Sequence, residues 1–292
     1  MKKNSSISLS HVASATLSLK GKKVAIVGGT GGIGQALSRY MASRGADVMV
    51  VGQTFRDADT PGITFLRADL ASMKEAARVA KLLPSEELDM LVFTTGIFAA
   101  PQRQVTAEGI EKDMAVSYLS RLAILRQVGP ILGRARGATS SKTRVFVMGY
   151  PGTGQIGRLG DLNAEQNYSA MAVHMNTVAG NEILVLDSAK RYLNARFFGL
   201  NPGLIKTNIR DNFFGRGSLK SKIMESLIGL LTQSPAQYAE RISSILFAPD
   251  LEKFNSIFFD KKGNPIHASD GMTSSHVNRF IEESEALLQM AA

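Results

Sequence analysis

A glycine cluster near the start of the chain most constrains how this sequence can fold. The cluster, VGGTGGIG at 27–34, ends a short apolar segment and opens a segment whose apolar residues recur at helical spacing up to Gly45. It contains GxGxxG as Gly29, Gly31 and Gly34, and GxxxGxG as Gly28, Gly32 and Gly34. Either spacing lets the backbone turn tightly beside a pyrophosphate, which the helix N-terminus would bind. The context favours a dinucleotide-binding loop over a plain tight turn.

The remaining sequence alternates short apolar segments with longer amphipathic ones, which indicates strands and helices in turn. Strands are expected within 22–29, 46–52, 63–70, 88–96, 143–149, 195–203 and 256–260. Helices are expected after the glycine cluster, over 72–83, from Thr106 to 132, over 168–191, from Ser234 and from Ser274, with Ser72 and Glu75 forming a capping box. Such alternation is typical of an α/β fold with a doubly wound parallel sheet. We predict one Rossmann-type domain over 21–292.

Composition excludes several classes of protein and site. A chain of 292 residues with 44% hydrophobic residues can bury a large core, and the absence of Cys excludes a thiol nucleophile, an iron–sulfur cluster and a Cys-based zinc site. The four His residues are scattered, so no metal site is expected. No apolar segment is long enough to span a membrane.

The formal net charge of +9 suggests nucleic-acid binding until its position is considered. Residues 1–23 carry five Lys and no acid, and residues 133–144 carry four basic residues and no acid, so these two segments hold the whole excess. No stripe of alternating aromatic and basic residues accompanies them. We therefore expect no nucleic-acid partner. We also expect a flexible, solvated tail over residues 1–20, with neither a secretory signal nor a transit peptide.

The choice between NAD and NADP depends on the end of the second strand. An acid there would accept a hydrogen bond from the ribose 2′-hydroxyl of NAD. This chain instead reads Gly52-Gln53-Thr54-Phe55-Arg56. Because no acid ends the strand and Arg56 could bind a 2′-phosphate, the sequence favours NADP(H) over NAD(H).

Four blocks on the expected elements resemble the short-chain dehydrogenase/reductase family, particularly its retinol-dehydrogenase-like members, over about residues 20–290. They are VGGTGGIG, Asp69-Leu70, Phe93-Thr94-Thr95-Gly96 and NPGLIKTNI at 201–209. The resemblance implies an NAD(P)-dependent oxidoreductase. The residues it assigns to the cofactor are Gly28, Thr30, Gly31, Gly32, Ile33, Gly34, Gln53, Arg56, Asp69, Leu70, Thr94, Thr95, Gly96, Pro202, Gly203, Leu204, Ile205 and Thr207.

The family's catalytic Ser, Tyr and Lys are not found at the matching positions. Val147-Met148-Gly149-Tyr150 stands where the family has its Ser, and the helix that should carry YxxxK reads His174-Met175-Asn176-Thr177-Val178. The family's supporting Asn corresponds to Ser117. None of the six Tyr residues has a Lys four positions later, so the motif is absent in every register.

His174 and Tyr150 are the candidate proton donors, with Ser117 as a further catalytic candidate. An unperturbed imidazole titrates near pH ~6.5 and can act as a general acid. A packed helix residue is the structural alternative for His174. We expect hydride transfer to a carbonyl, imine or activated alkene of a small organic substrate; the alternative is an inactive dinucleotide sensor or interaction protein on the same fold.

The segment 210–233 follows the NPG block and resembles the family's substrate lid, with Phe213 and Phe214 in an apolar roof. An amphipathic helix packed on the core is the alternative for this segment. The resemblance also implies pairing into a homodimer or homotetramer through the helices at 106–132 and 168–191. We expect a cytoplasmic location.

Overall fold

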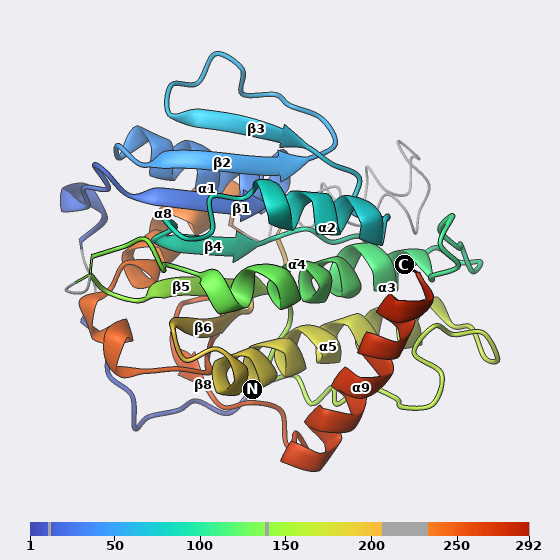
Figure 1. Ribbon diagram of the computed structural model, residues 1–292. Coiled ribbons are helices and arrows are strands. Elements are labelled where there is room, and N and C mark those ends of the chain that lie inside the picture. The colour runs from blue at the N-terminus through green and yellow to red at the C-terminus, as the bar shows by residue number, and fades with distance from the viewer. Residues whose placement is uncertain (11–12, 138–139, 206–232, 292) are drawn as a thin grey trace.

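The chain forms an eight-stranded sheet in the order β3-β2-β1-β4-β5-β6-β7-β8, parallel except for the last pair (Figure 1). The computed structural model describes residues 1–10, 13–137, 140–205 and 233–291. The strand order reverses between β1 and β4, as in a doubly wound fold. The predicted fold class is confirmed.

The strands follow the apolar segments of the sequence because both faces of the sheet are covered by helices. The strands are β1 (Lys23–Val27), β2 (Asp47–Gly52), β3 (Ile63–Arg67), β4 (Met90–Phe93), β5 (Thr143–Met148), β6 (Ala195–Leu200), β7 (Ile257–Phe259) and β8 (Pro265–Ile266). All seven expected strands are present. The antiparallel β8 is an addition that its two-residue length hid from the pattern.

The helices divide into two layers, one on each face of the sheet (Figure 1). One layer holds α1 (Gly32–Ser43) and α8 (Pro235–Leu246), which pack on each other. The other holds α2 (Met73–Leu82), α3 (Lys112–Met114), α4 (Ser120–Val128), α5 (Ala170–Arg191) and α9 (Ser274–Met290). Helix α9 crosses the outer side of α4 and α5.

The helix expected from Thr106 begins only at Lys112. Thr106 accepts instead in a turn with Gly109, whose φ of +81° lies in the left-handed region that a helix excludes. Glu111 caps the helix, and one π-helical turn, Ala115–Leu119, separates α3 from α4. Such turns often occur at functional sites.

The expected capping box of α2 is only half correct. Ser72 accepts from the backbone N–H of Glu75 over 3.2 Å, but the Glu75 carboxylate pairs with Arg78. The Ser72 N–H donates to Asp69 O instead, and Glu108, from the loop before α3, accepts from the Ser72 hydroxyl and the Met73 N–H. The sequence could not predict this cap because its acid lies 35 residues away.

The described part of the N-terminal segment lies along the C-terminal elements. Lys3 forms an antiparallel bridge with Ile266, Lys2 pairs with Asp270 at 2.9 Å, and Leu19 is buried. The flexibility expected for residues 1–20 stays a prediction. Almost all of the expected lid at 210–233 lies outside the described residues.

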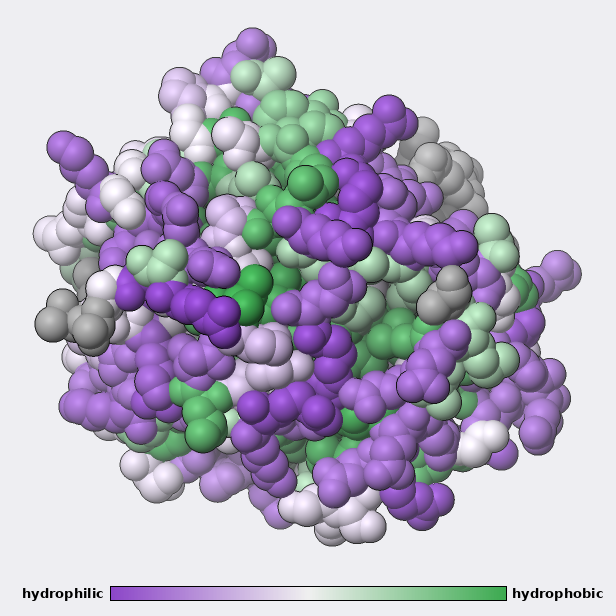
Figure 2. Space-filling model, in the orientation of Figure 1, coloured by the Kyte–Doolittle hydropathy of each residue, from purple (hydrophilic) through white to green (hydrophobic). Residues whose placement is uncertain are grey.

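Within the described residues no helix is long and apolar enough to cross a membrane. Figure 2 shows polar side chains over most of one face, with apolar atoms in separate small areas.

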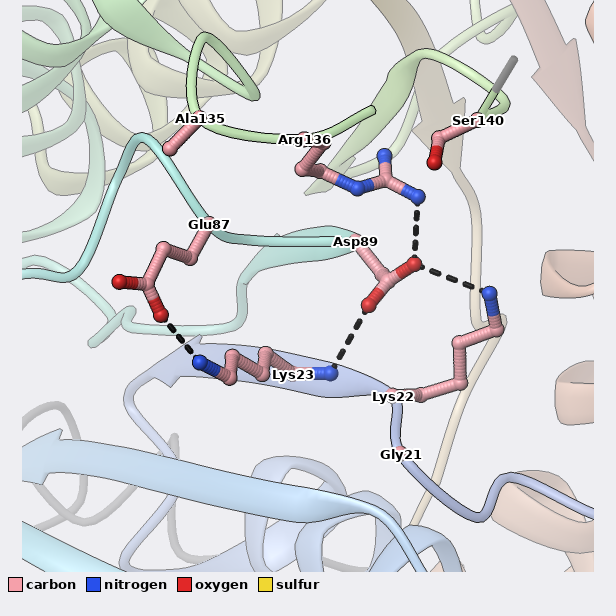
Figure 3. Close-up of a pocket in the computed structure, with 8 residues that line it drawn as sticks. All are labelled: Gly21, Lys22, Lys23, Glu87, Asp89, Ala135, Arg136 and Ser140. Atoms are coloured by element: carbon pink, nitrogen blue, oxygen red, sulfur yellow. Dashed lines mark hydrogen bonds and ion pairs between the residues drawn. The ribbon is translucent and has the colours of Figure 1, made fainter. Parts of the chain in front are cut away.

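The two basic segments meet at the edge of the sheet where β1, β4 and β5 begin. There they line a cavity of about 560 Å³ together with two acids, and the lining residues are Gly21, Lys22, Lys23, Glu87, Asp89, Ala135, Arg136 and Ser140 (Figure 3). Asp89 accepts from Lys22 Nζ at 3.0 Å and Arg136 Nη2 at 2.6 Å, and Glu87 pairs with Lys23. The basic segments are thus bound by acids of the domain.

Candidate active site

The predicted site residues gather at the opposite edge, beyond the carboxyl ends of the parallel strands. The glycine loop follows β1, Gln53 and Arg56 follow β2, and Asp69 and Leu70 follow β3. The segments after the other central strands are Thr94–Gly96 after β4, Tyr150 after β5, and Pro202, Gly203, Leu204 and Ile205 after β6. Parallel strands end at the same edge, so residues from distant blocks lie together. Thr207 lies outside the described residues.

The glycine loop fits closely against the end of β4. Gly28 has a φ of +96°, and a Cβ there would overlap the backbone nitrogen of Thr95. A Cβ on Gly34 would overlap the carbonyl oxygen of Gly28. Gly31 caps α1 with extended backbone, and a Cβ there would meet nothing nearer than Arg56 Nη1 at 3.8 Å. The loop is therefore tightly packed where Gly28 and Gly34 meet their neighbours, and it is open at Gly31, at the N-terminus of α1. An open helix N-terminus is suited to binding a pyrophosphate.

The Arg56 guanidinium lies over the glycine loop, where its Nη1 donates to the carbonyl oxygen of Thr30 over 2.7 Å. The next residue, Asp57, is buried, and its carboxylate accepts from Arg39 Nε at 2.6 Å and from Gln35 Nε2. Asp57, the first acid after β2, is therefore bonded to α1, whereas Arg56 is exposed.

Asp113 joins two of the predicted catalytic residues. Its side chain is 0% exposed, and Oδ2 lies 2.8 Å from Nδ1 of His174. Its Oδ1 accepts from the Ser117 hydroxyl, whose oxygen accepts in turn from the Ile97 N–H at 3.0 Å. Asp113 and Ser117 share one helix face because they are four residues apart, and α5 brings His174 to them. Asp113 fixes both side chains.

An aromatic ring and a second buried acid adjoin this pair. The His174 ring stacks on Phe98 with a centroid distance of 4.0 Å and an interplanar angle of 27°. Glu111, which caps α3, is 1% exposed, and burial raises its pKa to about 7. Its carboxylate accepts from the Met114 N–H over 2.8 Å. An aligned imidazole with an acid partner and a stacked wall has the geometry of a general acid.

A buried cation lies behind the pair. Arg121 is 3% exposed, and its Nη1 donates to Met148 O at 2.6 Å and to Asn181 Oδ1 at 2.8 Å. Its Nη2 donates to Thr95 O. Asn181 Nδ2 then donates to Ser117 O at 2.9 Å, which connects the cation to the Asp113 cluster.

Sequence reasoning missed Asp113, Arg121 and Phe98. A polar stripe on the helix after Glu111, with Asp113, Ser117 and Arg121 at four-residue spacing, was the signal that could have found the first two. Tyr150 follows β5 at the predicted position and is partly exposed. Among the described residues no group of His, Asp and Glu could hold a metal ion.

Comparison with known sequences places the chain in a family of oxidoreductases. The family model for short chain dehydrogenases matches residues 22–141. An uncharacterized oxidoreductase of Saccharomyces cerevisiae, YKL107W, is 50% identical over 272 residues, which cover 92% of this chain and 88% of the yeast protein. Retinol dehydrogenase 14 of Mus musculus is 23% identical, covering 82% of this chain and 78% of the mouse protein.

Solved structures agree on the fold. A crystal structure of an uncharacterized protein from Mycobacterium paratuberculosis has a TM-score of 0.71 at 19% identity and covers 96% of this chain and 98% of its own. The Pseudomonas aeruginosa RhlG/NADP active-site complex has a TM-score of 0.58 at 22% identity, with 84% and 96% covered. With the sheet order, the glycine loop and the relatives in agreement, the chain belongs to the short-chain dehydrogenase/reductase family and is an oxidoreductase with retinol-dehydrogenase-like homologues.

Proposed function

We propose that this oxidoreductase prefers NADP(H), reduces a carbonyl, imine or activated alkene of a small organic substrate, and takes its proton from the His174–Asp113 pair. The observation that carries the proposal is the buried Asp113 carboxylate, which contacts both His174 and Ser117. His174 stands at the helix position where the resemblance places a Tyr, and Asp113 fixes its ring so that it can act as a general acid. The active site is atypical in this respect.

The dinucleotide would be held by the loops at the carboxyl ends of the strands. Backbone amides of the glycine loop and of α1 would bind the pyrophosphate, Asp69-Leu70 the adenine, and the segments after β4 and β6 the nicotinamide side. When bound, the nicotinamide supplies or accepts the hydride. The protein's own contribution is position, proton supply and charge.

Preference for NADP(H) is supported by two contacts. Arg56 lies over the loop with its Nη1 bonded to Thr30 O, so its remaining donors are available to a 2′-phosphate. The buried Asp57 carboxylate is bound by Gln35 and Arg39, which direct it toward α1. The RhlG protein, which shares the fold, was solved with NADP.

Proton transfer follows from the tautomer that Asp113 selects. With Nδ1–H donated to Asp113, Nε2 is the nitrogen that exchanges a proton with the substrate. As a general acid, the ring would start doubly protonated: the substrate oxygen takes the proton from Nε2, and the imidazole is left neutral with its Nδ1–H still bonded to Asp113. Stacking on Phe98 restricts the ring plane during this step. Ser117 supports the carboxylate, because its hydroxyl is already bonded to it.

The pair is tested by His174→Gln and Asp113→Asn, assayed with NADPH and a panel of aldehydes, ketones, quinones and imines. We expect either variant to lower turnover by about 10²–10⁴-fold, the range for general-acid help, while NADPH binding is kept. His267→Gln, which changes an exposed His, is the matched control. Unchanged turnover in His174→Gln would remove His174 from the mechanism and leave Tyr150 as the donor.

A dinucleotide sensor without turnover is the competing function. Nucleotide binding by the glycine loop does not require Asp113 to bond both His174 and Ser117. This arrangement therefore favours the enzyme over the sensor. The same panel separates the two functions: tight NADPH binding without oxidation by any substrate supports the sensor.

Assembly and location stay predictions. The helices through which the resemblance implies pairing, 106–132 and 168–191, carry α9 on their outer side. A homodimer or homotetramer through this face would require α9 to move. A cytoplasmic location is our working assumption.

A further inference from the structure

Arg121 is a buried cation for which no hydrogen bond to a carboxylate is found among the described residues. Its guanidinium donates to two carbonyl oxygens, Thr95 O and Met148 O, and to the amide oxygen of Asn181. Its Nε is buried and has no partner among the described residues. Burying a guanidinium without a bonded anion is costly, because its charge is neutralised only by dipoles and by more distant groups. The position of this cation therefore requires an explanation beyond packing.

Two of the three acceptors, Thr95 and Met148, lie at the ends of β4 and β5, and we call these two strand ends the floor of the candidate site. Thr95 follows β4 within the block assigned to the cofactor, and its nitrogen touches the space that Gly28 leaves open. Met148 ends β5, two residues before Tyr150. Asn181 belongs to α5, two turns after His174. One planar guanidinium thus ties together two strand ends and the helix that carries the proposed acid.

Hydrogen bonds lead from the cation to the acid through Asn181 and Ser117. Asn181 accepts from Arg121 and donates to the backbone oxygen of Ser117. The side-chain hydroxyl of the same Ser117 donates to Asp113, which bonds His174. The Asp113 carboxylate in turn favours the charged form of Arg121.

We propose that Arg121 is a positioning residue that fixes the ends of β4 and β5 beneath the dinucleotide and holds them to the helix that carries His174. The proposal rests on the function proposed above and adds a residue from a different helix to it. The hydroxyl of Ser117 also joins the segment after β4 to Asp113, since it accepts from the Ile97 N–H. Arg121 adds bonds to the ends of both β4 and β5.

The first test separates the geometry of Arg121 from a general structural role. Arg121→Lys keeps the charge but loses the planar fork, and Arg121→Met loses both. We expect each to raise the dissociation constant for NADPH, measured by its fluorescence, by about 10-fold or more, because hydrogen bonds to a charged group are lost. Arg144→Lys and Arg144→Met are matched controls, since Arg144 is a buried Arg at the other end of β5 that also donates to a carbonyl oxygen, Leu246 O.

The second test reads the position of the His174 ring. The imidazole C–H signals of the four histidines are recorded by NMR at one pH, with His174→Gln used for assignment. We expect the His174 signal to shift in Arg121→Lys and in Arg121→Met, because the bonds from Arg121 to the strand ends and to Asn181 are lost. It should keep its wild-type position in the Arg144 variants, and the signal of the exposed His267 should stay in place in all variants. If Arg121→Met does not fold, Arg121→Gln provides the neutral variant.

The two tests distinguish the positioning role of Arg121 from a purely structural role and from the proposed reaction. If both Arg121 variants lose thermal stability like the Arg144 controls but keep the wild-type affinity for NADPH and the wild-type His174 signal, Arg121 is structural only and the proposal is wrong. Absence of turnover in the wild-type protein would instead overturn the proposed reaction, and the NADPH affinity and the His174 signal would still decide the role of Arg121. A wild-type protein that binds no NADPH would overturn both the proposed function and the floor that Arg121 is said to fix.

Discussion

The hydroxyl of Tyr118 donates to Ser284 Oγ over 2.9 Å, across 166 residues of the chain. This contact joins the π-helical turn before α4 to α9. The Tyr118 ring also meets Phe280 edge to face, with centroids 5.7 Å apart. Arg126 of α4 adds an ion pair with Glu285, at 2.6 Å. The C-terminal helix α9 is therefore an integral part of the core on this side of the sheet, and it covers the face of α4 and α5 that would otherwise be free for a second subunit.

Truncating Phe280 to Ala should detach α9. Phe280 is 0% exposed, and such truncations cost about 3–5 kcal/mol of unfolding free energy, which urea titration measures. Met290→Ala on the same helix removes a side chain that is 73% exposed and should change little. A loss in Phe280→Ala no larger than the loss in Met290→Ala would contradict the burial of α9 in the core.

Replacing Gly28 with Ala should disrupt the loop more than its backbone angle alone predicts. A non-glycine residue at positive φ costs about 1–2 kcal/mol, and Gly109→Ala, with φ of +81° and open space around the added methyl, measures this cost by itself. At Gly28 the methyl also overlaps Thr95 N. We expect a larger loss of stability and no detectable NADPH binding. Equal losses in the two variants would mean that the loop does not pack on β4 as described.

Removing the Arg56 side chain should change the choice of nucleotide. Arg56→Ala is expected to weaken NADPH binding by about 10–100-fold, the value of one or two charged hydrogen bonds, and to leave NADH binding nearly unchanged. Fluorescence titration with both nucleotides measures the ratio. Arg134→Ala, an exposed Arg at the opposite edge of the sheet, is the control. An equal loss for both nucleotides would show that Arg56 does not recognise the 2′-phosphate.

The buried Glu111 should make stability depend on pH. Burial raises its pKa from 4.5 to about 7, so between these values the native state holds a proton that the unfolded state has lost. Unfolding free energy should therefore fall as pH rises from 4.5 to about 7, by about 3 kcal/mol in total from this group. Glu111→Gln keeps an oxygen for the Met114 N–H and should lack this slope. Urea titrations between pH 5 and 8 compare the two; parallel curves would exclude the effect.

Neutralising Asp89 should expose the basic character of the chain. Asp89 accepts from Lys22, Arg136 and the Lys23 backbone (Figure 3). Asp89→Asn should lower the unfolding free energy by about 1.5–3 kcal/mol and increase retention on heparin at low salt, because two cations lose their partner. Glu240→Gln, which removes an exposed acid of α8, is the charge-matched control. Strong retention of the wild-type protein would contradict the expectation that polyanions are not its partners.

The fold was predictable because its strands are covered on both faces. Continuous apolar segments such as 88–96 predict β4 with no knowledge of their neighbours. Element boundaries were less predictable: helical periodicity suggested a start at Thr106, but Gly109 at positive φ delays it to Lys112. The contact of Glu108 with the start of α2 was not predictable either, because a local sequence pattern cannot reveal a partner that is distant in the chain.

The sheet, the glycine loop and the family were predictable from the sequence, because they depend on local spacing and on the order of elements along the chain. The sequence also identified His174, Tyr150 and Ser117 as candidates by their position. Only the tertiary structure brought Asp113 to His174, across 61 residues, and Arg121 to the ends of β4 and β5. It also paired Lys22, Lys23 and Arg136 of the two basic segments with Glu87 and Asp89. Charge and hydrogen bonding act over a few ångströms in space, and the packing of helices on the sheet decides which residues come within that distance.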